Sequence, residues 1–299
     1  MYKNRLFFLA LSLLTAVVLV LASCQREPIE DPTDDPTEEP TPGGGGGNSD
    51  TTATFLPTGT VIPNAVTDYD GNHYDAVVIG NQVWMAENLI TTHFADGEEI
   101  LSGEGSPQVA SATVPYRYVP GAGTADVAVY GYLYNWCAVM HGAFSSDESP
   151  SGVQGICPNG WHVPSDAEWD EFADTISSHP EYVAGDDIRQ IDKAIASTTH
   201  WHSSTYPNSV GNNQNQNNAT HFGLMPAGLA PGSSPGGCSL EFYANLWSCT
   251  EYKNDPDQAW FRFINNQSAR AFHAHSNAHY PKTNGMSVRC LRDTGANDQ

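Results

Sequence analysis

The chain has 299 residues, of which 34 are acidic and 12 are basic, and its formal net charge at neutral pH is −22. This balance argues against a nucleic-acid-binding protein and against docking on anionic lipid through a basic surface, because both need clustered Lys and Arg. Only 15% of the residues are charged, whereas Gly (27), Pro (20), Tyr (13) and Trp (7) are plentiful. Such a composition is typical of loop-rich β or α+β domains of exported proteins.

Residues 1–23 are predicted to form a lipoprotein signal peptide. Lys3 and Arg5 precede an apolar run at 6–21 whose length suits the core of a signal peptide. A membrane-spanning helix is the alternative, because about 17 to 25 apolar residues can cross a bilayer. However, the run ends in Leu-Ala-Ser-Cys, which resembles the lipobox of bacterial lipoproteins. We therefore expect Cys24 to be acylated and to anchor the mature chain in lipid without a spanning helix.

Residues 24–60 are predicted to form an acidic, disordered tether. Between Gln25 and Asp50 lie eight acidic residues, five Pro and five consecutive Gly. Such a segment buries too little apolar surface to offset the entropy lost on ordering. Acidic residues after the lipidated Cys resemble surface-export signals of Bacteroidota lipoproteins, and Gln25 is not the Asp associated with inner-membrane retention. We expect a lipid-anchored protein of the outer membrane, exposed at the cell surface.

Residues 61–299 are predicted to form one domain that begins with a hairpin and a helix. Two β-favouring runs within 74–88 flank Gly80-Asn81, a pair typical of tight hairpin turns. Ser165 and Glu168 have the spacing of a capping box at the start of a helix. The apolar residues that follow have the spacing of one helix face: Trp169, Phe172, Ala173 and Ile176.

Later segments predict a second helix and several strands. A helix is expected at 186–196, with Ile188, Ile191, Ala194 and Ile195 on its apolar face. Residues 130–140 fit a buried helix or a buried strand equally well. Residues 259–264 and 268–275 suggest a hairpin that turns at Asn265-Asn266, and 286–292 alternates like a last strand. This order of elements indicates an α+β domain.

Five segments in chain order carry a resemblance to a known family: QVWMAENL at 82–89, YGYLYNW at 130–136, GICPNGWHVPSDAEWDEF at 155–172, LWSCTE at 246–251 and SVRCLRD at 287–293. From about residue 66 to 293 the chain resembles the Fibrobacter succinogenes major paralogous domain, which is common in exported lipoproteins of Bacteroidota. The resemblance implies a C-type-lectin-like fold, related in pattern to formylglycine-generating enzymes, with two helices packed on loop-rich antiparallel sheets.

The chemistries of these related folds have no clear counterpart in the sequence. Formylglycine-generating enzymes use a reactive Cys pair, for which we find no equivalent. Calcium-dependent lectins use a Glu/Gln-Pro-Asn/Asp loop and a Trp-Asn-Asp strand. Neither Asp255-Pro256-Asp257 nor Tyr206-Pro207-Asn208 matches that loop. We therefore expect no cofactor and no catalytic residue.

Five Cys remain after Cys24, and the oxidising compartment of an exported protein favours disulfides. The fold resemblance implies a bond between Cys157 and Cys290. Cys249 could then pair with Cys137 or with Cys238, and the sequence does not choose between them. A zinc site of the Cys-x-x-Cys type is absent from the sequence. His273 and His275 could share a metal ion if they lie on one strand face, but solvent-facing His residues are the expected alternative.

A ligand-binding surface is expected in the C-terminal region, which often forms the ligand face of C-type-lectin-like proteins. Trp201, among polar neighbours, is the candidate for an exposed aromatic platform. The other candidates for this surface are Asn265, Arg270, His273, His275, Asn277, His279 and Tyr280. We expect a non-catalytic binding or adhesion module for a glycan or protein ligand. An enzyme of formylglycine-generating or carbohydrate-active type, and a structural tip subunit of a surface assembly, are the alternatives.

Overall fold

The computed structural model describes residues 56–105, 109–230, 239–272 and 278–293. The chain divides into two compact units, Met1–Thr52 and Ala53–Gln299, and all described residues belong to the second. The predictions for Cys24, Cys238, His273, His275 and Asn277 therefore lie outside the described residues, as does the predicted signal peptide. Within the described part of the chain, no helix has the length and apolar character needed to span a bilayer.

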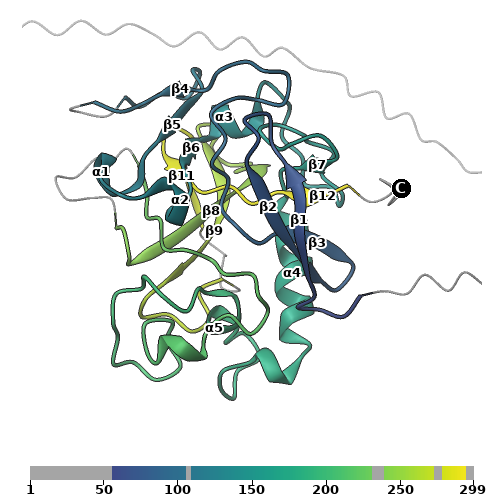
Figure 1. The fold of residues 1–299 in the computed structure, drawn as a ribbon, viewed down its shortest axis with the longest axis vertical. Helices are drawn as coiled ribbons and strands as arrows, with labels where there is room; N and C mark the ends of the chain where they lie inside the picture. The colour runs from purple at the N-terminus through teal and green to yellow at the C-terminus, as the bar shows by residue number, and fades with distance from the viewer. Residues whose placement is uncertain (1–55, 106–108, 231–238, 273–277, 294–299) are drawn as a thin grey trace, which may run out of the picture. The chain divides into compact units, whose positions relative to one another are not determined.

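The first sheet joins the two ends of the described unit (Figure 1). The hairpin of β2 (His73–Ile79) and β3 (Gln82–Met85) turns at Gly80-Asn81, which confirms the prediction from the sequence. Gly80 has φ +60°, and a Cβ there would lie 2.9 Å from Cγ2 of Thr175, so a side chain would be strained and crowded. The strands are antiparallel in the order β1 (Val61–Thr67), β2 (His73–Ile79), β3 (Gln82–Met85), β12 (Leu291–Arg292) and β7 (Trp161–His162).

Two further sheets complete the β structure. One has the order β10 (His279–Pro281), β9 (Gln258–Asn265) and β8 (Tyr243–Glu251). The other has the order β11 (Gly285–Met286), β6 (Leu133–Asn135), β5 (Tyr116–Tyr118) and β4 (Leu101–Ser102). The predicted hairpin of 259–264 with 268–275 is wrong in its described part, because β9 pairs with β8 and β10 instead. The predicted last strand at 286–292 is divided between β11 and β12.

The main helix, α4 (Asp166–Ser177), begins at the predicted capping box. The Ser165 hydroxyl accepts from the backbone N–H of Glu168, and the Glu168 carboxylate accepts from that of Ser165. The remaining helices are short: α1 (Pro120–Gly123), α2 (Val127–Tyr130), α3 (Trp136–Met140), α5 (Asp192–Ile195) and the 3₁₀ turns η1 (Pro180–Tyr182) and η2 (Gln214–Gln216). Residues 130–140 are thus divided among a helix end, a strand and a helix.

The helix predicted at 186–196 is wrong over its first half. Only α5 forms, and the side chain of Ile188 is 65% exposed although it was expected on the apolar face. The Asp187 carboxylate accepts from both the backbone N–H and the guanidinium of Arg189. This local side-chain to backbone bond offers the chain an alternative to a helical turn.

An aromatic cluster packs α4 against the first sheet. The rings of Trp84 and Trp169 stack with centroids 4.2 Å apart, and Phe172 meets Trp84 edge to face at 5.1 Å. Trp169, Phe172, Ala173 and Ile176 are all buried, as the helical spacing predicted. Figure 1 shows α4 beside the strands of this sheet. Burial of these rings supplies much of the apolar stabilisation of this half of the domain.

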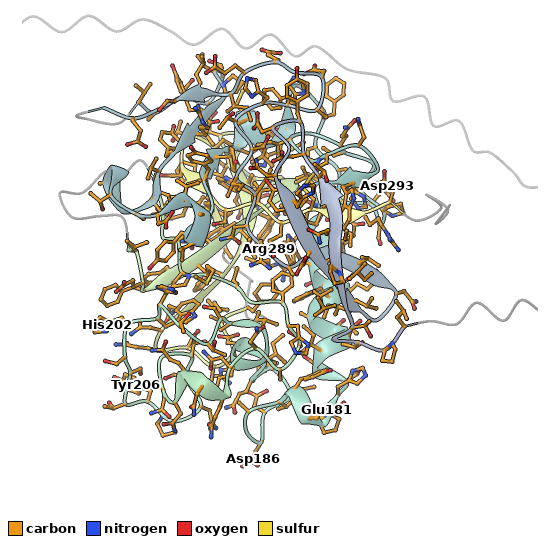
Figure 2. The ribbon with its side chains drawn as sticks, viewed as in Figure 1. Glu181, Asp186, His202, Tyr206, Arg289 and Asp293 are labelled. Carbon is orange, nitrogen blue, oxygen red and sulfur yellow. A yellow bond between two sulfur atoms is a disulfide. The ribbon has the colours of Figure 1, made fainter. Side chains whose placement is uncertain are left out.

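A disulfide and a buried Arg fix the segment before β12. Cys157 and Cys290 are bonded, as the fold resemblance implied. Arg289, which lies in the middle of the molecule (Figure 2), donates to the carbonyls of Phe222 and Met85 and to Oδ1 of Asn88. Burial lowers the pKa of this guanidinium to about 9. The guanidinium therefore ties three segments together within the core.

The remaining described cysteines are not paired. Cys137 and Cys249 are both free thiols, so the proposed Cys137–Cys249 bond is wrong. The Sγ of Cys249 instead points to the carbonyl oxygen of Ser146, at 3.4 Å. Burial raises the pKa of the Cys249 thiol to about 12, which keeps it protonated and unreactive at neutral pH.

Candidate ligand-binding site

One face of the β8–β9–β10 sheet carries alternating rings and amides. Residues two apart on a strand point to the same face, which puts Tyr243 and Asn245 of β8 beside Phe263 and Asn265 of β9. The register pairs Tyr243 with Asn265, and Asn245 with Phe263. Each amide therefore lies opposite an aromatic ring on the neighbouring strand. Figure 1 shows β8 and β9 running side by side.

This face forms the floor of a cavity with a volume of about 480 Å³. The volume lies within the range of small-molecule sites, roughly 300 to 1,000 Å³. Tyr243 and Tyr280 are 40% and 41% exposed, whereas Phe261 and Met286 are buried, so the rim is open and the floor is closed. The described lining residues are Leu229, Ser239, Tyr243, Asn245, Phe261, Phe263, Asn265, Tyr280 and Met286.

The rings of the floor hold one another in place. Phe261 and Phe263 are stacked with centroids 5.7 Å apart, and Tyr280 meets Phe261 edge to face at 5.8 Å. Trp247, which lies two residues after Asn245 on β8, packs edge to face on Phe261 with ring centroids 6.4 Å apart. Because Phe261, Phe263 and Tyr280 brace one another, this part of the aromatic surface is formed before a ligand arrives.

The amides of the floor are held by hydrogen bonds to the backbone. Nδ2 of Asn245 donates to the carbonyl of Gly228 at 2.8 Å. Oδ1 of Asn265 accepts from the N–H of Gln267 at 2.9 Å. These bonds fix the direction of both amides. The cavity therefore combines braced apolar rings with oriented polar groups, which is the composition of a preformed ligand site.

Only some of the described candidates for the ligand face line the cavity. Asn265 and Tyr280 line the cavity. His279 does not, because neighbouring residues of β10 point to opposite faces and its ring stacks on Tyr252 at 3.7 Å. Arg270 also lies outside the cavity lining and forms an ion pair with Asp187 at 2.8 Å. Hydrogen bonds from Arg189 and Arg270 lower the pKa of the Asp187 carboxyl.

The prediction of Trp201 as an exposed platform is wrong. Its side chain is only 4% exposed. Nε1 donates to Oγ of Ser197 at 3.0 Å, and its backbone N–H and carbonyl both bond to the side-chain amide of Gln214. The ring belongs to a buried hydrophobic cluster that also contains Phe222 and Leu224, so the polar neighbours of Trp201 in the sequence did not indicate exposure.

Several lining residues were not selected from the sequence. Tyr243 and Asn245 lie in the segment YANLW, where every second residue has a side chain suited to a mixed polar and aromatic face. Phe261 and Phe263 continue to Asn265 with the same spacing. This period of two was the available signal. The period alone does not say which strands pair, because strand pairing is set by contacts between residues far apart in the chain.

Neither the His93–Asp70 group nor the His162 group forms a nucleophilic relay. Oδ1 of Asp70 and Oγ1 of Thr92 both contact Nδ1 of His93, at 2.6 and 3.0 Å. A relay needs the carboxylate and the hydroxyl on opposite nitrogens. The buried His162 is bonded through both nitrogens to carboxylates, those of Glu168 and Asp293. Both groups are therefore better explained as structural contacts.

Comparison with known proteins gives a family match. The model of the family described as the Fibrobacter succinogenes major domain matches residues 77–292, more than two thirds of the chain. The described residues that line the cavity all fall within this span. The family description names no reaction and no ligand. No curated protein and no solved structure matches the chain significantly.

Proposed function

This chain belongs to the Fibrobacter succinogenes major domain family, and from that premise we propose that it is a non-catalytic binding module for neutral glycans. The observation that carries the proposal is the cavity on the β8–β9–β10 sheet, with its braced rings and oriented amides. We further propose a C-type-lectin-like scaffold, anchored in the outer membrane by acylated Cys24 and exposed at the cell surface. The lipobox-like Leu-Ala-Ser-Cys supports this anchor.

The chemistry of the cavity suits a sugar. The C–H face of a pyranose packs on aromatic rings, and its hydroxyls exchange hydrogen bonds with amide groups. Tyr243 and Tyr280 at the rim offer accessible ring area, and Asn245 and Asn265 offer polar contacts beside it. Rings and short amides lose little conformational entropy on binding, which favours affinity from a small surface.

The uncharged lining of the cavity and the negative charge of the chain favour a neutral ligand. In the described part of the lining, no side chain is acidic or basic. The chain as a whole carries a formal charge of −22, which repels anionic ligands at long range. An uncharged glycan avoids this repulsion, whereas a sialylated or sulfated one does not.

A glycan array tests the proposal. The full chain, purified in detergent, is screened beside the variants Tyr280→Ala and Asn265→Ala. The control is Tyr206→Ala, because Tyr206 is 58% exposed at the edge of the molecule (Figure 2) and is not among the described lining residues. We expect the native chain and the control to bind the same neutral glycan, and both cavity variants to bind it about tenfold more weakly or worse.

Three results would contradict this function. The first is equal binding by all four proteins, which would place the ligand elsewhere. The second is chemical turnover of a glycan by the native chain, and the third is binding to a protein partner but to no glycan. Thermal unfolding of each variant establishes that a loss of binding is not a loss of fold.

A further inference from the structure

A separate group of metal-binding side chains lies at the junction of the 94–98 turn and the end of α3. One donor atom from each of Asp96, Glu98 and His141 lies within 4.8 Å of the others. Nε2 of His141 is 3.5 Å from Oε2 of Glu98 and 3.9 Å from Oδ2 of Asp96. None of the three lines the aromatic cavity.

The fold directs the imidazole toward the carboxylates. The ring of His141 stacks on the buried ring of Phe94, with centroids 3.6 Å apart and an angle of 5° between the planes. His141 has φ +46° and caps α3, with its N–H bonded to the carbonyl of Cys137. The stack and the cap together fix both the position and the plane of the ring. Nε2, at the far edge, faces Asp96 and Glu98.

The carboxylates are also placed by local bonds. The N–H of Phe94 donates to the carbonyl of Glu98 at 2.8 Å and closes the turn. Oδ1 of Asp96 accepts from the N–H of Glu98 at 3.0 Å, while its other oxygen, Oδ2, is the one nearer His141. Backbone donors of this kind orient the ligands of metal sites.

Nε2 of His141 and Oε2 of Glu98 form a long hydrogen bond at 3.5 Å, and neither contact of His141 with the two carboxylates is short enough to be a strong one. Hydrogen bonds from nitrogen to oxygen are typically about 2.7 to 3.2 Å long, and both His141 distances exceed this. Zinc binds nitrogen and oxygen at about 2.0 to 2.2 Å, so ligands along one edge of its tetrahedron are roughly 3.4 Å apart. The two distances from Nε2 of His141, 3.5 and 3.9 Å, lie close to that spacing. A bound cation would also offset the repulsion between the two carboxylates.

We propose that Asp96, Glu98 and His141 form a site for a divalent transition-metal ion, with zinc the best match. One imidazole and two carboxylates suit zinc better than calcium, which takes six to eight oxygen ligands. Asp96 and His141 also line an open cavity of about 390 Å³, in which water or a ligand group can complete the coordination. This site is independent of the glycan-binding function.

Calorimetric titration of the full chain with ZnCl₂ after chelator treatment tests the site. The chain has 11 His, so the informative quantity is the loss of one equivalent of bound zinc rather than zinc binding itself. The first variant is His141→Asn, since Asn tolerates positive φ. The second combines Asp96→Asn and Glu98→Gln. The control is His202→Asn, because the exposed His202 also stacks on a Phe ring, that of Phe242, at 4.4 Å.

We expect the native chain and the control to bind one more equivalent of zinc than either variant, or to bind it at least about tenfold more tightly. Zinc should raise the unfolding temperature of the native chain more than that of either variant, by mass action. CaCl₂ should not reproduce this difference. Equal zinc stoichiometry and affinity in all four proteins would overturn the proposal. Unfolding in chelator shows whether each variant remains folded.

Discussion

The imidazole of His162 and the carboxylate of Glu168 form a buried ion pair, with Nε2 2.8 Å from Oε1 and each side chain only 2% exposed. The second oxygen of Glu168, Oε2, accepts from the N–H of Ser165 in the capping box. Across the ring, Nδ1 of His162 lies 2.6 Å from Oδ1 of Asp293. A neutral imidazole has one N–H, so both contacts are hydrogen bonds only when the ring is protonated. The charged ring therefore links the start of α4 to the residue after β12.

The protein should lose stability as the pH rises through the pKa of His162. Burial opposes the charged ring, but hydrogen bonds and charge from Glu168 and then Asp293 outweigh it and raise the pKa. A raised pKa in the folded state gives a stabilisation that is complete below the unfolded value, about 6.5, and is lost above the folded value. Urea unfolding at about pH 6 and about pH 9 measures the difference in the free energy of unfolding.

A His162→Gln variant separates this effect from other titrations. Removing one partner of a buried pair costs about 3 to 5 kcal/mol, and the pH-dependent part should disappear with it. His73→Gln is the control, because His73 is exposed at the start of β2. We expect the control to keep the pH dependence of the native chain. The same pH dependence in His162→Gln would show that the pair does not titrate in this range.

The Cys157–Cys290 bond should be a large contributor to stability. It closes a loop with a sequence separation of 133 residues. In the chain-entropy description such a loop contributes about 5 kcal/mol. We expect the double variant Cys157→Ala, Cys290→Ala to be destabilised by several kcal/mol in urea unfolding, and Cys137→Ala to lie near the native chain. A double variant within about 1 kcal/mol of the native chain would contradict the chain-entropy account.

Local signals in the sequence predicted the elements that depend on near neighbours. The capping box at Ser165 and the turn at Gly80-Asn81 both appear as predicted, because their bonds form within a few residues. Ile188 and Trp201 were predicted wrongly for two different reasons. A local bond between Asp187 and Arg189 competes with the first turn of the second helix. The ring of Trp201 is buried in a hydrophobic cluster whose members come from segments far apart in the chain, and its backbone bonds to Gln214, 13 residues away.

The candidate site was only partly accessible from the sequence. Asn265 and Tyr280 were chosen from the composition of the C-terminal segment and from the ligand face that the lectin-like resemblance implies there, and they line the cavity. Its other wall comes from β8, whose pairing with β9 was not predicted, since the sequence favoured a hairpin within 259–275. Which residues share a face depends on register, and register is set by contacts far apart in the chain.

The N-cap of α4 should contribute measurably to stability. The Ser165 hydroxyl accepts from the N–H of Glu168 and donates to the carbonyl of Glu148 at 2.8 Å. Ser165→Ala removes both bonds and should cost about 1 to 2 kcal/mol in urea unfolding. Ser177→Ala is the matched control at the other end of the helix, because its buried hydroxyl has no hydrogen-bond partner. The control should be neutral or slightly stabilising. Equal losses in both variants would contradict the capping role.

Lys193 holds the polar loop that precedes residue 218. Its side chain is buried, and Nζ donates to the carbonyl of Asn212 at 2.6 Å, to Oδ1 of Asn217 at 2.8 Å and to the carbonyl of Ser209 at 3.3 Å. Burial lowers the pKa of this ammonium group. The loop oxygens thus replace the water that a buried ammonium loses, and in return the ammonium satisfies buried acceptors.

Replacing Lys193 with Met should therefore loosen the loop as well as destabilise the fold. Met keeps most of the apolar stem and removes the donors, so the buried acceptors lose their partner, at a cost of about 2 to 4 kcal/mol. Lys253→Met, at an exposed position, is the control. Hydrogen exchange should rise within 209–217 in the first variant and stay unchanged in the second. If exchange in this loop is the same in both variants, other contacts hold the loop and the ammonium does not.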